Sequence, residues 1–186
     1  MKRRLFIAIN LPENIKNRLV EYQKKWAYLP VRWTIKPNLH ITLVFIGYVD
    51  DNEMYEICKI VREIAGRHSP FIINLERIIL GPPNKFPRMF WVEGRVNEEI
   101  AKLKNDLEDS LLKSDNSGYK KKENRAYRPH ITLGRIKQGQ WRKLDFRPKI
   151  DEKFEFSFPV ETIEVMQSNL KRTGAEYSVL ESVELG

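Results

Sequence analysis

Two tetrapeptides of the chain are identical and combine histidine with threonine. The sequence His-Ile-Thr-Leu occurs at residues 40–43 and again at residues 130–133, and these repeats hold two of the three histidines. In a β-strand, side chains two positions apart point to the same face. Each repeat therefore predicts a strand that presents an imidazole and a hydroxyl on one face and buries two aliphatic side chains on the other.

Two such faces across a groove would suit the cleavage of a phosphate ester. An ordinary imidazole titrates near neutral pH, so one histidine could accept a proton from water while the other donates a proton to the leaving oxygen. The hydroxyls could donate hydrogen bonds to the non-bridging phosphate oxygens. We therefore treat His40 and His130 as candidate catalytic residues, and Thr42 and Thr132 as candidate phosphate ligands.

Two other roles for the histidines have to be weighed. A single histidine on a strand is more often structural than catalytic, although the duplication favours chemistry. A metal site needs three or more ligands, usually with a carboxylate or further histidines. Neither repeat contains Asp or Glu, and His68 lies in a Gly-Arg-His-Ser-Pro stretch that predicts a surface position at a helix end. We expect neither a metal nor another cofactor.

Three segments have the apolar periodicity of amphipathic helices. The first follows Pro12, with apolar residues at positions 15, 19, 22, 26 and 29. The second begins at Asp50 or Asp51 and ends near Gly66. Its apolar face includes Cys58, the only cysteine, which we interpret as a small core residue. The third runs from an N-cap at Asn97 to about residue 113.

Most of the remaining sequence favours strands, because it is rich in β-branched and aromatic residues. The expected strands are residues 4–10, 39–47, 72–80, 89–96, 130–136, 154–159, 161–168 and 175–185, with a hairpin turn at 171–174. Loops are expected at 81–88 and 114–128. Interleaved helices and late hairpins predict an α+β fold. No linker divides the chain, so residues 1–186 are expected to form a single domain.

The composition limits the partners and the location. Lys and Arg number 33 against 25 Asp and Glu, which gives a formal charge of +8. A basic surface attracts polyanions, above all nucleic acid, although a solvated basic surface without a partner has the same composition. No stretch is long enough to span a membrane. The basic and apolar N-terminus is too short for a signal peptide, so we expect a cytoplasmic protein.

The repeats and their flanking segments resemble the two-histidine phosphoesterases. The similarity is to one branch, the RNA 2′,3′-cyclic phosphodiesterases, also described as 2′-5′ RNA ligases, and it covers nearly the whole chain. It rests on residues 4–9, 11–12, 38–43, 45–47, 128–135 and 174–177. The resemblance implies an α+β fold of two pseudo-symmetric lobes of mainly antiparallel sheet, with outer helices and an active-site groove between the lobes. It also implies hydrolysis of a terminal 2′,3′-cyclic phosphate on RNA to a 2′-phosphate.

The resemblance also assigns roles to residues. His40 would donate a proton to the 3′ oxygen, His130 would accept a proton from water, and the two threonines would hold the phosphate. Arg135 could reach a phosphate oxygen, but plain alternation from His130 points it to the other face, so a bend at Gly134 would be needed. Phe6 is a candidate for stacking on a base, with core packing as the alternative.

Weaker candidates and other activities remain open from the sequence. Arg128 and Tyr127 are further candidates for contacting the RNA, and the lysines at 120–122 either follow an RNA backbone or belong to a solvated loop. The same site could act in reverse as a 2′-5′ ligase that joins tRNA halves. The chain could also be a non-catalytic module that binds RNA ends, or act on a small cyclic nucleotide. We expect a monomer. Its expected partner is RNA with a 2′,3′-cyclic phosphate end, and tRNA fragments are one candidate source of such ends.

Overall fold

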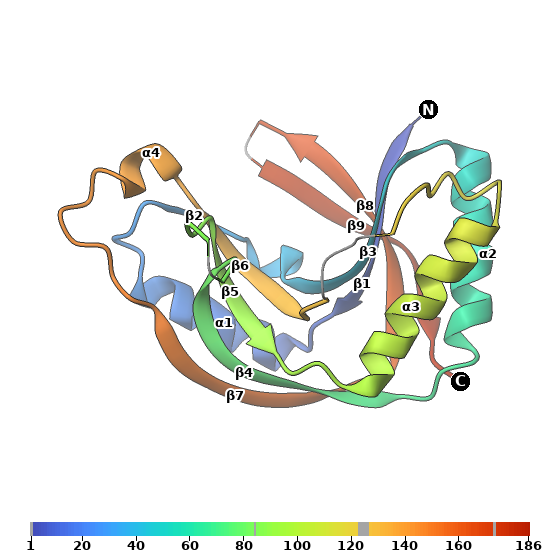
Figure 1. Cartoon of the computed structure of the whole chain (residues 1–186), viewed down its shortest axis with the longest axis horizontal. Coiled ribbons are helices and arrows are strands. Elements are labelled where there is room, and N and C mark those ends of the chain that lie inside the picture. Colours follow the sequence, from blue (N-terminus) through green and yellow to red (C-terminus); the bar gives the residue numbers. More distant parts are fainter. Residues whose placement is uncertain (1, 84, 123–126, 173) are drawn as a thin grey trace.

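Both repeats begin strands, and these two strands are neighbours at the middle of one antiparallel sheet (Figure 1). The computed structural model describes residues 2–83, 85–122, 127–172 and 174–186. The strands of the repeats are β3 (His40–Val49) and β6 (His130–Ile136). The others are β1 (Arg3–Asn10), β2 (Val31–Trp33), β4 (Phe71–Gly81), β5 (Met89–Gly94), β7 (Asp151–Val160), β8 (Thr162–Lys171) and β9 (Gly174–Glu184).

The order of the strands divides the sheet into two matching halves. The order is β7-β4-β5-β6-β3-β1-β8-β9, and β2 pairs with β6 outside this path. Each half therefore contains four strands of the path, and β6 and β3 meet at the boundary. Within the described residues, these two strands pair only at Ile41 and Ile131. The expected α+β fold with two pseudo-symmetric lobes is confirmed.

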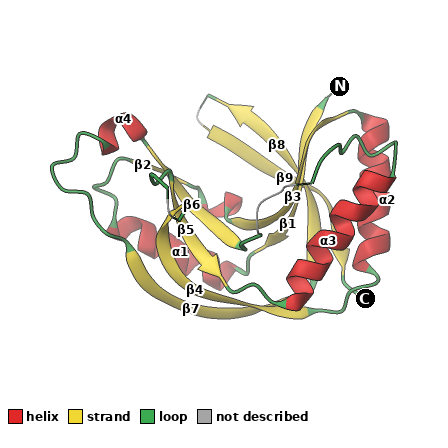
Figure 2. Cartoon of the chain, viewed as in Figure 1, coloured by secondary structure: helices red, strands yellow, loops and turns green. Residues whose placement is uncertain are grey.

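The helices cover the outer faces of the lobes (Figure 2). Helices α2 (Asp51–Ala65) and α3 (Glu98–Lys113) lie side by side over the lobe that contains β3 and β1. Helix α1 (Glu13–Lys25) packs against the other lobe, where Tyr22 contacts Phe154 of β7 edge-on. A 3-10 turn (Lys36–Asn38) and the short helix α4 (Gln138–Trp141) complete the described elements.

The predicted helices and strands are present, with differences at some ends. Asp50 caps α2 by accepting from the backbone N–H groups of Asn52 and Glu53, and Asn97 caps α3 in the same way. Helix α1 ends at Lys25 rather than near residue 29, and the backbone N–H groups of Trp26 and Ala27 donate to the carbonyls three residues before them. Strand β2 and helix α4 were not predicted. The hairpin β8–β9 turns where expected, with Lys171 opposite Gly174.

Burial follows the alternation that the repeats predict. Ile41 and Ile131 are fully buried, as is Leu133, and Leu43 is 3% exposed, whereas the histidines and threonines between them are partly exposed. The aliphatic side chains therefore anchor both strands in the core and leave the polar side chains on the other face. The expected loops at 81–88 and 114–128 include residues 84 and 123–126, which lie outside the described residues.

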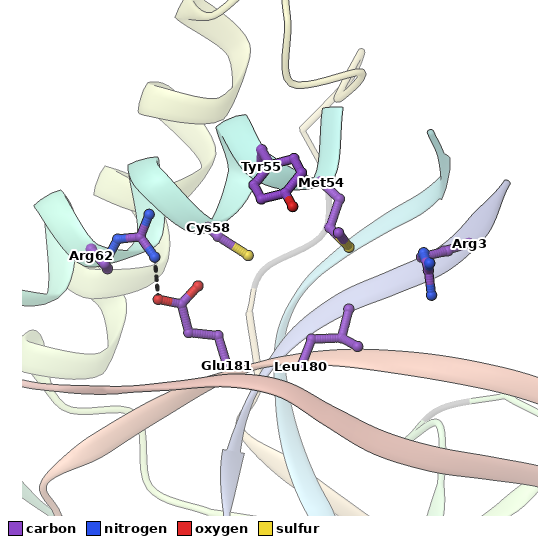
Figure 3. A pocket seen from close by; sticks show the side chains of 7 residues that line it. All are labelled: Arg3, Met54, Tyr55, Cys58, Arg62, Leu180 and Glu181. Carbon is purple, nitrogen blue, oxygen red and sulfur yellow. Dashed lines mark hydrogen bonds and ion pairs between the residues drawn. The ribbon is translucent and has the colours of Figure 1, made fainter. Parts of the chain in front are cut away.

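Two isolated residues have clear structural roles. Cys58 is 9% exposed beside a small pocket between α2 and β9 (Figure 3), and burial raises the pKa of its thiol to about 12. The thiol is therefore protonated and unreactive at neutral pH. The expectation of a surface position for His68 is wrong. Its side chain is buried, and Nε2 lies 3.0 Å from Oδ2 of Asp106 on α3. No helix in the described ranges is long and apolar enough to cross a membrane.

Candidate active site

The two repeats line one groove at the junction of the lobes. The groove has a volume of about 600 Å³, within the usual range for small-molecule sites. His40, Thr42, His130 and Thr132 all line it, together with residues of β1, β2, β8 and β9. The structure therefore brings together two pairs of side chains that lie far apart in the sequence.

The register of β3 and β6 arranges these four side chains diagonally. Ile41 lies opposite Ile131 in an antiparallel pair. One position away on either side, His40 comes opposite Thr132 and Thr42 comes opposite His130. Diagonal neighbours in antiparallel strands are usually about 7–8 Å apart. Such a separation leaves room for a phosphate group between the two imidazoles.

Each imidazole is held by the backbone carbonyl two residues before it. His40 Nδ1 lies 2.7 Å from the oxygen of Asn38, and His130 Nδ1 lies 2.8 Å from the oxygen of Arg128. A carbonyl only accepts, so Nδ1 carries the proton in both rings and Nε2 is the basic nitrogen of the neutral form. His40 Nε2 lies 3.0 Å from Oγ1 of Thr42. The same local contact thus selects the same tautomer in both repeats.

The surroundings of His40 are aromatic and poorly hydrated. Its ring centroid lies 5.0 Å from that of Phe6 and 5.2 Å from that of Tyr177. Burial lowers the pKa of His40 to about 4, the bond to Asn38 opposes this shift, and the charge of nearby His130 adds to it. Without an anion beside it, His40 is therefore neutral at pH 7. A phosphate anion beside it would favour the protonated form and raise its pKa.

The surroundings of His130 differ, because an indole lies against its ring. Trp91 of β5 is stacked with His130 at a centroid distance of 4.1 Å. The indole in turn packs against the backbone at Gly81, where an added β-carbon would come within 2.3 Å of the ring. Only a glycine leaves space for the indole there, so Gly81 allows Trp91 to lie where it stacks on His130.

Both repeats contain a β-bulge at their leucine. Ile7 and Ala8 of β1 pair with Val44 and Thr42, which leaves Leu43 as an extra residue in β3. Phe90 and Trp91 of β5 pair with Gly134 and Thr132, which leaves Leu133 extra in β6. A bulge shifts the alternation by one position. The residue five positions after each histidine therefore returns to the face of the histidine.

Phe45 and Arg135 are the residues that the bulges bring into the groove. Both line it and both are exposed, Phe45 by 62%. The bend that Arg135 requires thus lies at Leu133, one residue before the predicted position. Arg135 contacts Sδ of Met89 at 3.8 Å. The repeats place an aromatic ring on one side of the groove and a guanidinium on the other.

The charge that lines the groove is positive. Its described lining includes the cationic side chains of Arg4, Arg32, Arg135 and Lys171 and contains no carboxylate. Nor do the described residues contain a group of three or more His, Cys, Asp and Glu side chains that could hold a metal ion. This lining suits an anionic ligand, because cations concentrate anions in a concave site.

The other sequence candidates lie around the groove in different ways. Phe6 lines it, but its side chain is only 3% exposed and packs against His40, which leaves little ring surface for a base. Arg128 is not among the lining residues, and its guanidinium pairs with Glu93 at 2.9 Å. The Tyr127 hydroxyl donates to the Thr42 carbonyl at 3.0 Å. Lys122 pairs with Asp109 of α3.

Sequence reasoning missed several residues around the groove. Trp91, Phe45, Arg32 and Tyr177 were not candidates. The match between Phe45 and Arg135 was available from the sequence, since both follow a repeat histidine by five positions. No comparable signal marks Trp91 or Tyr177, because their positions depend on strand pairing across the lobes.

Comparisons with known proteins find a family, relatives and solved structures that match most of the chain. The model of the 2′-5′ RNA ligase superfamily matches residues 12–172. The RNA 2′,3′-cyclic phosphodiesterase of Methanocaldococcus jannaschii is 30% identical over 184 residues, covering 95% of this chain and 98% of the relative. The crystal structure of TT0787 of Thermus thermophilus is similar, with a TM-score of 0.84 and 26% identity over 98% of this chain and 97% of that one. E. coli LigT complexed with 3′-AMP has a TM-score of 0.79 and 25% identity over 100% of this chain and 99% of that one.

Proposed function

The chain belongs to the 2′-5′ RNA ligase superfamily, and we propose that it is an RNA 2′,3′-cyclic phosphodiesterase that hydrolyses a terminal cyclic phosphate to a 2′-phosphate. One observation carries the proposal. Two imidazoles, with Nδ1 of each held by a backbone carbonyl, line one cationic groove together with two hydroxyls. The relative from Methanocaldococcus jannaschii also supports the proposal, because its name gives this activity and its similarity extends over nearly the whole chain.

The reaction adds one water across the bond between phosphorus and the 3′ oxygen. Nε2 of His130 takes a proton from water as the water oxygen attacks phosphorus. The bond to the 3′ oxygen breaks, and His40 gives its proton to that oxygen, so the phosphate stays on the 2′ oxygen. His130 ends protonated and His40 neutral, and exchange with solvent restores both.

Because the pKa of His40 is low, substrate binding must also bring about the protonation of this residue. A His40 with no anion beside it is neutral at pH 7, yet the proposed acid must carry a proton. The negative charge of the cyclic phosphate raises the pKa of His40 when it binds. Proton uptake and substrate binding are therefore coupled, and the acid forms where it is used.

The remaining groups stabilise charge on the phosphate. The hydroxyls of Thr42 and Thr132 donate to the non-bridging oxygens, and the guanidinium of Arg135 neutralises the negative charge. Phe6 supports the His40 ring rather than a base, and Arg128 orients His130 through its carbonyl oxygen. We also propose that residues 1–186 act as a single domain, as a cytoplasmic monomer, on RNA ends that include those of cleaved tRNA.

The test is to identify the product made from a defined RNA. RNA that ends in a 2′,3′-cyclic phosphate is incubated with the protein, with and without a second RNA that has a 5′-hydroxyl. The expected product carries a 2′-phosphate and resists an enzyme that removes only 3′-phosphates. A 3′-phosphate product would mean that His40 does not protonate the 3′ oxygen. Accumulation of a 2′-5′ joined product would favour the ligase, and an unchanged substrate would exclude both activities.

A further inference from the structure

Arg32 of β2 lies directly opposite Arg135 of β6 in an antiparallel pair. Both side chains are exposed and both line the groove. Like charges placed directly opposite each other destabilise a sheet. Among the described residues neither guanidinium has a carboxylate partner, although nearby Arg77 and Arg128 both pair with Glu93. An unneutralised arginine pair in a groove points to a bound anion.

The backbone of β2 is fixed against β6, so Arg32 is placed by the fold. An added β-carbon at Gly134 would lie 2.6 Å from Cγ1 of Val31 and 2.8 Å from the Trp33 ring. The backbone N–H of Thr34 donates to the Leu133 carbonyl at 2.8 Å. Gly134 therefore allows β2 to approach the second repeat closely.

This arrangement has no counterpart in the other lobe. The first repeat has Val44 where the second has Gly134. In the described part of the chain, β3 pairs only with β1 and β6, so no short strand lies beside it as β2 lies beside β6. Arg32 therefore lies on one side of the groove without a counterpart at the matching position of the other side.

We propose that Arg32 forms a second phosphate subsite, beside Arg135 and the reacting phosphate, that binds the phosphodiester preceding the terminal nucleotide of the RNA. This inference rests on the proposed function, because it assumes that the cyclic phosphate lies between the histidines. Along β6, Arg32 lies opposite Arg135 whereas Ile41, next to His40, lies opposite Ile131, so Arg32 is displaced from both histidines toward the far end of that strand. It is thus placed for the next phosphate rather than for the reacting one. Paired guanidinium groups also bind phosphate oxygens with two parallel hydrogen bonds each.

The subsite makes RNA a better substrate than a single nucleotide. A mononucleoside 2′,3′-cyclic phosphate carries only the reacting phosphate, whereas a dinucleotide with the same end carries one more. The wild-type protein should therefore show a higher kcat/KM for the dinucleotide, and the gain should come from a lower KM.

The experiment compares these two substrates in wild type, Arg32→Ala, Arg32→Lys and Lys102→Ala. Lys102 is exposed on α3, away from the groove, and its replacement changes the net charge by the same amount. In Arg32→Ala, the preference for the dinucleotide should fall about 10- to 100-fold, as expected for the loss of charged hydrogen bonds. Arg32→Lys should retain part of the preference, and Lys102→Ala all of it. The plot of log(kcat/KM) against log[salt] for the dinucleotide has a negative slope. Its magnitude should be smaller by about 0.7 in Arg32→Ala, the value for one contact to single-stranded nucleic acid.

Binding measurements separate this proposal from the proposed function. Titration of the protein with mononucleotide and dinucleotide 2′-phosphates needs no turnover and should show the same preference. If the wild type hydrolyses neither substrate yet binds the dinucleotide more tightly through Arg32, the proposed function fails and the subsite stands. If it hydrolyses both but Arg32→Ala leaves the ratio of kcat/KM unchanged, the subsite is wrong.

Discussion

The imidazole of His130 stacks on the indole of Trp91, with the ring centroids 4.1 Å apart and the planes inclined by 29°. The rings near His40 are arranged differently, with Phe6 tilted by 37° and Tyr177 edge-on at 84°. The face of an indole stabilises a cation placed over it. An indole face in this position would therefore stabilise the imidazolium that the proposed reaction produces when His130 takes a proton from water.

Replacing Trp91 by leucine should lower kcat about 3- to 30-fold, since a cation over an aromatic face gains about 0.7–2 kcal/mol. Trp91→Phe keeps a ring face and should lose less. The measurement is kcat on RNA with a cyclic phosphate end, with thermal unfolding recorded for each variant. Wild-type turnover in a folded Trp91→Leu protein would show that the stack has no catalytic role.

Removal of either repeat histidine should nearly abolish hydrolysis. His40→Ala and His130→Ala should each reduce kcat by roughly 10²–10⁴-fold, the usual contribution of a general acid or base. His68→Gln is the matched control, because this histidine pairs with Asp106 and does not line the groove. Near-normal turnover of both alanine variants, with the control equally active, would rule out the two-histidine mechanism.

The stability of the protein should depend on the protonation of His40 in mildly acidic solution. Its pKa is about 4 in the folded protein and about 6.5 in an unfolded chain. Between these values the unfolded state binds a proton that the folded state does not, so the free energy of unfolding falls as pH drops from about 6.5 to about 4. Above this pH range the protonation of His40 does not change the free energy of unfolding. Below it, the decrease in that free energy due to His40 is complete.

The variant His40→Gln isolates this contribution, because glutamine does not titrate. Urea unfolding at pH 7 and pH 4.5 should show a larger loss of stability in the wild type than in the variant. Equal losses would mean that the pKa of His40 is not lowered. A phosphate-containing ligand should reduce the difference, since it raises the pKa of the folded state.

Hydrolysis should survive treatment with a chelator. The described groove lining offers imidazoles, hydroxyls and cationic side chains, and the two imidazoles alone are too few for a zinc or manganese site. The rate should be the same before and after incubation with EDTA and dialysis. If EDTA removes activity and Zn²⁺ or Mn²⁺ restores it, a metal takes part in the reaction.

The sequence was sufficient for the parts of the fold that local patterns control. Alternation in the repeats predicted which side chains are buried, and the caps at Asp50 and Asn97 predicted where two helices begin. These features depend on residues that are close together in the chain, so they can be predicted from a single sequence. The duplication itself identified the four side chains that the groove brings together.

The missed features depend on contacts between distant segments. A β-bulge exists only relative to a partner strand, so the turn of Arg135 into the groove required the pairing of β6 with β5. Strand β2 has three residues and forms because Gly134 lets it approach. Burial of His68 depends on α3, which carries Asp106. None of these partners is adjacent in the sequence.

The contact between Ile41 and Ile131 also determines how movement of the lobes affects the two histidines. In the described residues it is the only paired position between β3 and β6, and each histidine is one residue away from it. In any rotation of the lobes about this contact, displacement grows with distance from the pivot. The imidazoles would then move least, and the groove mouth at β2 and at the β8–β9 hairpin would move most. A rotation of this kind would preserve the spacing of the two imidazoles and would change the width of the groove at its outer edges.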